Sequence, residues 1–441
     1  MGRPPATQVF PHGATSIIEF KERETHGTEL KPEEKGRGSS EREELCSDIW
    51  LSKPLSSPLL SKSLGSNDRH EVLDVLFDRQ RFFSFHHHFM IGPSFSDQFR
   101  HAILMTLHDS QEVVLGIHRI LLKLLDLKEK PNDGSAPFGF TEAARSLKCL
   151  QSVTIGHLND AAAVLLLGQI LFVYHVMVMG TSAHTIAQNC ILSAKGWYPM
   201  LMAQPCLQPI FMAPILIDTV ESLVRRRIPI IGIPHAFCDK EDRTMGLSVP
   251  LIPILYDLCK ASNYDKSLSI NRVRNNTDSL DIKNDNYSEV EQRIRQWEPS
   301  CPHTLFSKYS HIEVSAMMMQ ARVYRIAGLL LIHRLRYPLG VEDEEGARLA
   351  MTIVAELSCF VKWAPQEVKD MAVYLPVFLA MIEVQQPADQ ILSHLAPHSF
   401  FGNCVDGLRG FVKLTQDAKR AGSQGLWFDL VDENLSTGII P

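Results

Sequence analysis

Residues 310–340 place the strongest constraint on how this chain can fold, because their local signals agree on one long, packed helix. Ser310 and Glu313 have the S-x-x-E spacing of a capping box, in which each side chain accepts a hydrogen bond from the other's backbone N–H. Pro338 forces the residue before it out of helical geometry, and Gly340 suits the turn that follows. At about 1.5 Å per residue, the helix is about 40 Å long. Its inner face is predicted from apolar residues at helical spacing: Ile312, Ala316, Met319, Val323, Ile326, Leu330 and Tyr337.

Charged residues on both sides of this turn predict a second helix that runs antiparallel to the first. His333, Arg334 and Arg336 occupy the last turn, where positive charge meets the negative end of the helix dipole. The next helix opens on the acidic run 342–345, the sign that its amino terminus prefers. We expect Arg334 and Arg336 to pair with this run as exposed ion pairs, each contributing about 0.2–1 kcal/mol.

Helical periodicity extends from about residue 71 to near the end of the chain, so we predict an all-α fold of about twelve helices. A hydrophobic fraction of 45% allows a sizeable core. Residues 1–66 are polar and proline-rich, which predicts a disordered tail. Residues 67–441 then form one all-α domain, with a long loop at 262–286 where apolar periodicity is lost. The best strand-like stretch, residues 229–234, is bracketed by prolines.

Residues 161–180 are apolar over a length that could cross a membrane. However, Asp160 begins the stretch, Gln169 and His175 interrupt it, and the next basic residue is Lys195. A helix that is apolar on every side is also typical of the centre of a large α-domain. We therefore predict a core helix, and we expect no membrane association.

The cysteines are spaced too widely for a structural zinc site. Zinc clusters and ribbons need at least one C-x₂₋₄-C pair, because one tight turn must present two thiolates to the ion. Of the nine cysteines, the closest two, Cys190 and Cys206, lie 16 positions apart. We therefore predict no metal site, and buried, reduced thiols in an intracellular protein.

Several short runs suggest sites, but each has a simpler structural explanation. Neighbouring side chains in His86–His88 diverge, so at most two could reach one metal ion, and a half-buried connector is preferred. Arg225–Arg227 could be a nuclear-import patch or a phosphate contact, yet basic residues at a helix end also complement its dipole. Met317–Met319 could line an adaptable ligand pocket, but three consecutive positions cover most of a helix circumference, so core packing is preferred. His157 and His175 are interpreted as hydrogen-bonded interior histidines.

Short catalytic signatures are missing from the sequence. It contains no G-x-x-x-x-G-K-[ST], no G-x-G-x-x-G, no G-x-S-x-G and no H-E-x-x-H. We therefore predict that the protein is not an enzyme, and we expect no catalytic, cofactor-binding or metal-binding residues and no cofactor. A helical enzyme without a short signature is a further hypothesis. The net charge of −6 gives no global basic field that would favour nucleic acid.

Two groups of motifs occur together in the chain. The first comprises DAAA at 160–163, LLGQ at 166–169 and GWYP at 196–199, and the second comprises QA at 320–321, IHRLRYPLG at 332–340 and residues 350–357. Together they resemble the all-helical regulatory region of fungal zinc-cluster (Zn₂Cys₆) transcription factors, the fungal-specific transcription factor domain. The resemblance extends from about Phe95 to Leu430.

The resemblance implies a nuclear regulator of transcription whose helical region modulates activity and in some members senses small molecules. In that family, the DNA contact comes from a six-cysteine cluster near the amino terminus, of the C-x₂-C-x₆-C type. This sequence has only Cys46 in that region. We therefore expect no direct DNA contact from this chain. Either a partner supplies that contact, or an upstream exon encodes the cluster.

On this basis we predict a transcriptional regulator or co-regulator of fungal metabolic or secondary-metabolite genes, located in the nucleus. It would act with protein partners in transcription complexes and respond to a small-molecule effector. The alternative is a small-molecule-binding helical module with no direct role in transcription. That alternative predicts a dry cavity near Met317–Met319 and residues 165–172.

Overall fold

In a computed structural model, the described residues are 75–76, 78–107, 111–129, 140–179, 183–235, 241–275, 285–363, 372–395 and 402–434. They all lie in the second of two compact units, Ser57–Pro441. The predicted disordered tail at 1–66 lies outside the described residues.

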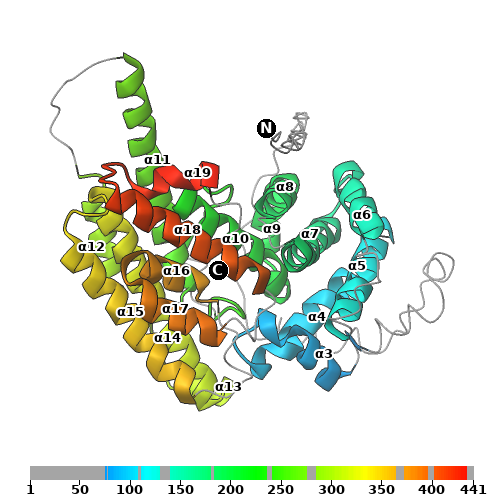
Figure 1. Ribbon diagram of the computed structural model, residues 1–441. Helices are drawn as coiled ribbons and strands as arrows, with labels where there is room; N and C mark the ends of the chain where they lie inside the picture. Colours follow the sequence, from blue (N-terminus) through cyan, green and yellow to red (C-terminus); the bar gives the residue numbers. More distant parts are fainter. Residues whose placement is uncertain are drawn as a thin grey trace, which may run out of the picture. The chain divides into compact units, whose positions relative to one another are not determined.

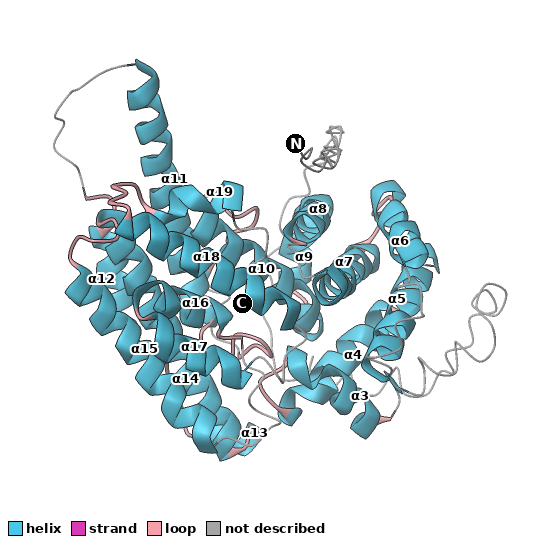
Figure 2. Ribbon diagram, viewed as in Figure 1, coloured by secondary structure: helices cyan, strands magenta, loops and turns pink. Residues whose placement is uncertain are grey.

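The predicted all-α class is confirmed (Figures 1 and 2). Throughout the described ranges the only extended pairing is an isolated bridge between Asp242 and Gly246. The strand-like stretch at 229–234 is irregular backbone. The α-helices are α3 (Arg79–His86), α4 (Ser96–Thr106), α5 (Gln111–Glu129), α6 (Phe140–Ser152), α7 (Leu158–Met179), α8 (His184–Ala194), α9 (Tyr198–Met202), α10 (Gln208–Arg225), α11 (Ile252–Asn275), α12 (Ser288–Gln296), α13 (Leu305–Lys308), α14 (His311–Arg336), α15 (Asp343–Trp363), α16 (Tyr374–Glu383), α17 (Gln385–Leu395), α18 (Gly402–Arg420) and α19 (Val431–Asn434).

The long helix expected from the sequence is α14, and both of its ends form as predicted. The Ser310 N–H donates to Glu313 Oε2 at 2.8 Å, and the Glu313 N–H donates to Ser310 Oγ at 3.3 Å. The helix ends at Arg336, two residues before Pro338. Gly340 then adopts a φ of +97°, which favours glycine. The turn carries the chain into α15, which packs along α14 together with α16 and α12.

The apolar segment at 161–180 lies within α7, which packs against α5, α6, α8 and α10. Two helical stretches, Leu158–Val178 and Pro205–Arg225, are long and apolar enough to cross a membrane by length and composition. Their most apolar windows are 72% and 94% buried against other parts of the protein. Gln169 uses its polar side chain inside this packing, donating to the Ile210 carbonyl of α10. This burial is what the core-helix interpretation of the segment expects.

The predicted loop at 262–286 is wrong over its first half, because α11 continues to Asn275. In Figure 1 the last turns of α11 extend beyond the neighbouring helices. The apolar pattern fades there because this part of the helix makes polar contacts. The Asn263 side chain donates to the Arg226 carbonyl at 3.1 Å, and Lys266 Nζ donates to the Arg225 carbonyl at 3.1 Å. A periodicity argument that counts apolar residues cannot detect a helix face held in this way.

The contact between α7 and α8 gives a testable consequence of close packing. A Cβ atom at Gly168 would lie 2.4 Å from Cys190 Sγ. We expect Gly168→Ala to lower the free energy of unfolding by about 1–3 kcal/mol, because the two helices must move apart. The measurement is urea unfolding followed by circular dichroism.

The control for this substitution is Gly410→Ala on the exposed face of α18, where an added Cβ meets nothing within 4 Å. Helix propensity alone should make that variant more stable by up to about 1 kcal/mol. Equal stability of Gly168→Ala and the unmodified chain would contradict the close approach of α7 and α8.

Candidate regulatory interface

The basic run Arg225–Arg227 lies where α10 ends and the chain reverses direction. Arg225 is the last helical residue, and Arg226 adopts the left-handed conformation with a φ of 55°. The terminal carbonyl groups of the helix are capped by side chains of α11, through the Asn263 and Lys266 contacts described above. Positive charge therefore lies at the end of α10, as predicted, since Arg225 is in its last turn. Asn263 and Lys266 of α11 also bind the terminal carbonyl groups.

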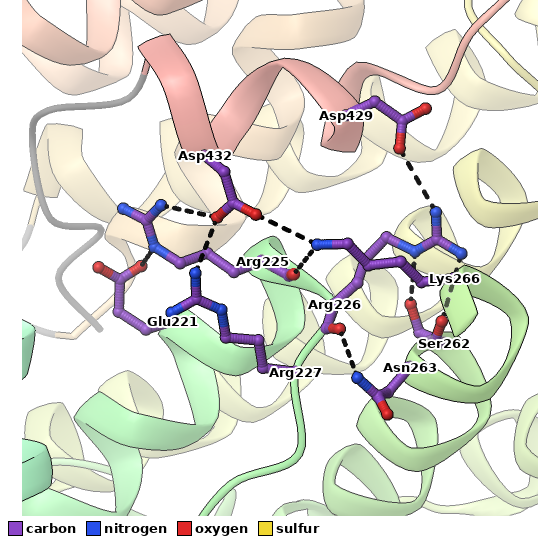
Figure 3. A network of polar contacts seen from close by, with 9 residues as sticks. All are labelled: Glu221, Arg225, Arg226, Arg227, Ser262, Asn263, Lys266, Asp429 and Asp432. Atoms are coloured by element: carbon purple, nitrogen blue, oxygen red, sulfur yellow. Dashed lines mark hydrogen bonds and ion pairs between the residues drawn. The ribbon is translucent and has the colours of Figure 1, made fainter. Parts of the chain in front are cut away.

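The three arginines are paired with carboxylates from distant parts of the chain (Figure 3). Asp432 of α19 accepts from Arg225 at 3.1 Å and from Arg227 at 3.1 Å through the same oxygen, Oδ1. Its other oxygen accepts from Lys266 Nζ at 3.2 Å. Arg225 also lies 3.4 Å from the buried carboxylate of Glu221.

Arg226 is buried and turns the other way. Its Nε donates to Ser262 Oγ at 3.1 Å, and its Nη2 donates to the Ser262 carbonyl at 3.2 Å. Its Nη1 lies 3.6 Å from Asp429. Each arginine of the run therefore has a carboxylate partner within the chain. Arg225 and Arg226 are largely buried, whereas the side chain of Arg227 is 48% exposed.

Protonation of Asp432 should weaken this network. Burial acts to raise the pKa of Asp432, but hydrogen bonds from Lys266 and Arg225 outweigh it and hold the pKa below its ordinary value. The ion pairs therefore stabilise the fold above the unfolded-state pKa of about 3.9, and this contribution is lost as the pH falls through the folded-state value.

We expect Asp432→Asn to lower the free energy of unfolding by about 1 kcal/mol near neutral pH, since the pairs are partly exposed. The difference from the unmodified chain should shrink below about pH 3, and also at about 1 M salt. Urea titrations at several pH values measure it. Asp417→Asn, which removes an exposed pair with Arg420 on α18, serves as the control. A difference that persists unchanged in acid would contradict the role of the Asp432 charge.

A second network surrounds Arg334, which is buried and not exposed as the sequence suggested. Its side chain is 1% exposed, and that of its main partner Glu383 is 4% exposed. The two form a two-pronged contact with both distances at 2.6 Å. Arg334 also donates to Asp343 at 2.8 Å, and Asp343 in turn lies 2.6 Å from Lys419 of α18. Burial acts to lower the pKa of Arg334, but Glu383 and Asp343 outweigh it and raise the pKa.

The predicted pairing of Arg334 with the acidic run 342–345 is correct for Asp343, but the same prediction for Arg336 is wrong. Arg336 pairs with Asp285 at 2.7 Å and with Glu291 of α12. Because α12 packs on α14, Glu291 of α12 and Asp285 just before it lie next to Arg336. The third basic residue of the turn, His333, contacts the Glu342 carbonyl, and burial followed by the Arg334 charge lowers its pKa.

A third buried cation, Arg243, was not singled out from the sequence. Its guanidinium group donates to the carbonyl groups of Phe89 and Pro209. Its Nη2 also donates to Gln169 Oε1 at 3.2 Å. Its Cζ lies 3.9 Å from the centre of the Phe99 ring. Burial lowers the pKa of Arg243 to about 10. The neighbouring Thr244 carbonyl accepts from Gln320 of α14 at 2.7 Å, so the loop at 241–248 joins α7 and α10 to α14.

The other predicted runs take structural positions. His86 Nδ1 contacts the Phe82 carbonyl, and His87 Nδ1 contacts the Ser84 carbonyl. Among the described residues, no group of three side chains that could hold a metal ion comes together. Met317 and Met319 are buried in the core, and Met318 packs against it. Burial lowers the pKa of His175.

Two interior assignments made from the sequence need correction. His157 is not an interior residue, because its side chain is 60% exposed beside Asp160, where the chain enters α7 from an irregular segment. The thiols of Cys190, Cys259 and Cys404 are buried as expected, whereas the exposed positions of Cys301 and Cys359 differ from the expectation. Burial raises the pKa of Cys190 to about 12 and that of Cys404 to about 11, which suits unreactive thiols.

The fold and these networks define a class of protein: a helical scaffold whose distant helices are joined by ion pairs, one of them fully buried. Residues 225–394 match the family model described as fungal specific transcription factor domain. The same comparisons found no similar curated protein and no similar solved structure. The match begins at Arg225 and ends within α17, so it contains the IHRLRYPLG motif and Arg334 with its partners Asp343 and Glu383. The DAAA and GWYP motifs precede it.

Proposed function

We propose that the protein regulates transcription of fungal metabolic or secondary-metabolite genes in the nucleus, acting through protein partners and without a DNA-binding module of its own. The observation that carries the proposal is the family match at 225–394, which supports a role in transcription regulation in general. The ion pairs of Arg225 and Arg227 with Asp432 are consistent with the lack of direct DNA contact, because cations neutralised by carboxylates are poorly placed to bind phosphate.

The proposal can be tested by tethering the full chain to a bacterial DNA-binding domain upstream of a reporter gene. We expect reporter output to change several-fold, and to change less with the destabilised Arg334→Met variant, which serves as the control. Fluorescence of a tagged chain should concentrate in the nucleus. Unchanged reporter output from a chain that is folded and nuclear would contradict the proposal.

Direct DNA binding is tested separately, by titrating purified chain against genomic DNA fragments. We expect only weak binding that disappears above about 0.2 M salt, as for non-specific contacts. A sequence-selective complex that survives this salt concentration would overturn the proposal that partners supply the DNA contact.

A small-molecule-binding module is the second candidate, and one observation favours it. Gln320 Oε1 and the Tyr324 hydroxyl are buried on α14 and have no hydrogen-bond partner in the described part of the chain. They follow Met317 along the helix, near the place where the alternative of a small-molecule-binding module predicts a cavity. Thermal stabilisation of the purified chain by one metabolite, reduced in Tyr324→Phe and Gln320→Leu, would support an effector site. Equal stabilisation of the unmodified chain and of both variants by every metabolite tested would contradict an effector site at these residues.

A further inference from the structure

The last described segment, Leu426–Asn434, differs in character from the helices before it, and we call it the strap. It comprises a single 3₁₀ turn, Trp427–Leu430, and the short helix α19. Its sequence LWFDLVDEN alternates apolar and acidic residues. It lies beyond the family match, which ends at residue 394. Acidic motifs of this kind are bound by arginine clusters in several peptide-binding domains.

The apolar side chains of the strap pack against aromatic residues of α16 and α18. The Trp427 ring packs edge-on against Phe378 of α16 at 5.8 Å between ring centres, and lies 6.3 Å from Phe411 of α18. Trp427 also stacks on Phe428 at 3.9 Å. Trp427, Phe428 and Val431 are all buried, at 3%, 3% and 0% exposure. These contacts anchor the strap by the hydrophobic effect.

The acidic side chains of the strap neutralise the basic run. Asp432 contacts Arg225, Arg227 and Lys266, and Asp429 faces Arg226. Without these two carboxylates the same surface would have four cations and one carboxylate, Glu221, a net charge of +3 (4 − 1). The surface beneath the strap therefore combines the aromatic residues Phe378 and Phe411 with a group of four cations.

A short exposed linker connects the strap to α18. All five residues of Ala421–Gly425 are exposed. Gly422 adopts a φ of +77° and closes α18, with its N–H bonded to the Lys419 carbonyl at 3.0 Å. Because α18 is terminated before the linker, the strap can leave the surface without breaking the hydrogen bonds of that helix.

We propose that the surface beneath the strap is a peptide-binding site, that the strap occupies it within the same chain, and that its external ligand is an acidic peptide with adjacent aromatic residues from a partner protein. The proposal rests on the proposed function and names the chemistry of the partner. A tethered strap competes at an effective concentration of about millimolar. An external peptide must therefore bind more tightly or be more concentrated than the tethered strap to displace it. The strap thus weakens the apparent affinity of the site for a partner.

The test uses the full chain with a protease site inserted in the exposed linker between Ala421 and Gly425. After cleavage, a fluorescent synthetic peptide of residues 424–434 is added and its binding is followed by anisotropy. We expect the peptide to exchange into the cleaved chain with a micromolar dissociation constant, and to bind the uncut chain at least tenfold more weakly. Circular dichroism during exchange checks that the helices persist.

Matched variants test the two parts of the recognition. A peptide carrying Asp429→Asn and Asp432→Asn should bind at least tenfold more weakly, and so should a peptide carrying Trp427→Ala. On the protein, Arg227→Gln with Lys266→Gln should weaken binding. Arg420→Gln should not, because Arg420 pairs with Asp417 of α18 and not with a carboxylate of the strap. Unrelated peptides with a Trp-Phe pair and the same acidic spacing should compete with the labelled peptide.

Three results would overturn the proposal: unfolding of the cleaved chain when the strap leaves, a strap that never exchanges, or equal binding of the Asn-substituted peptide. These results are separate from the transcription assay. A folded chain that binds the peptide but leaves the reporter unchanged would contradict only the proposed function.

Discussion

Replacing Arg334 by methionine is expected to lower the free energy of unfolding by about 3–5 kcal/mol, because the substitution leaves the Glu383 carboxylate buried without its partner. The guanidinium group also donates to the carbonyl groups of Pro338 and Val341 at 3.2 and 2.9 Å, so two backbone acceptors in the turn lose their donors. Urea unfolding measures the loss, as a lower midpoint at an unchanged slope.

Two further variants separate the ion pair from general packing. The double variant Arg334→Met, Glu383→Met should recover much of the stability, because neither charge is then left unpaired. Arg348→Met removes an exposed pair with Glu345, and should change stability by less than about 1 kcal/mol. A double variant as unstable as Arg334→Met alone would show that the turn hydrogen bonds, and not the buried charge, dominate.

The second large effect is expected at the opposite end of α14, for Glu313→Ala. Glu313 is fully buried and accepts from the Ser94 N–H at 2.8 Å and the Ser94 hydroxyl at 2.7 Å, in addition to its capping contacts with Ser310. Removing the carboxylate leaves these donors unpaired, at about 1–3 kcal/mol for each donor that stays buried. We expect a total loss of about 3 kcal/mol or more.

Hydrogen exchange distinguishes the two roles of Glu313. If the carboxylate ties the segment before α4 to α14, the Ser94 amide should lose its protection in Glu313→Ala while the middle of α14 keeps its own. The control is Glu289→Ala, an exposed acid in the first turn of α12, which should lose only about 0.3–1 kcal/mol. Unchanged exchange at Ser94 would contradict the tie.

The sequence was sufficient to predict the fold class and the limits of α14, because caps, prolines and periodicity act over a few residues. It could not predict what the terminal residues of that helix contact elsewhere. Glu313 reaches Ser94, 219 residues earlier in the chain, and nothing near either residue indicates the pairing. The glycine at position 92 is required by this contact, since a Cβ there would lie 2.4 Å from Glu313 Oε1. In the sequence, however, Gly92 cannot be distinguished from any other loop glycine.

The candidate site was predicted less completely than the fold, for the same reason. The basic run Arg225–Arg227 was recognised, yet its partner Asp432 lies 207 residues beyond Arg225. The polar half of α11 was assigned to a loop because its contacts with the run are hydrogen bonds rather than apolar packing. Ion pairs between distant segments depend on tertiary packing, which spacing in a single sequence does not encode.

The two buried ions at the ends of α14 have a consequence for how this region can change in length. A single inserted residue inside the helix would rotate everything beyond it by about 100° and shift it by about 1.5 Å along the axis. Arg334 would then point away from Glu383 while Glu313 stayed in place. Insertions and deletions between Glu313 and Arg334 are therefore incompatible with both contacts, and viable variants of this chain should differ in length only outside that interval.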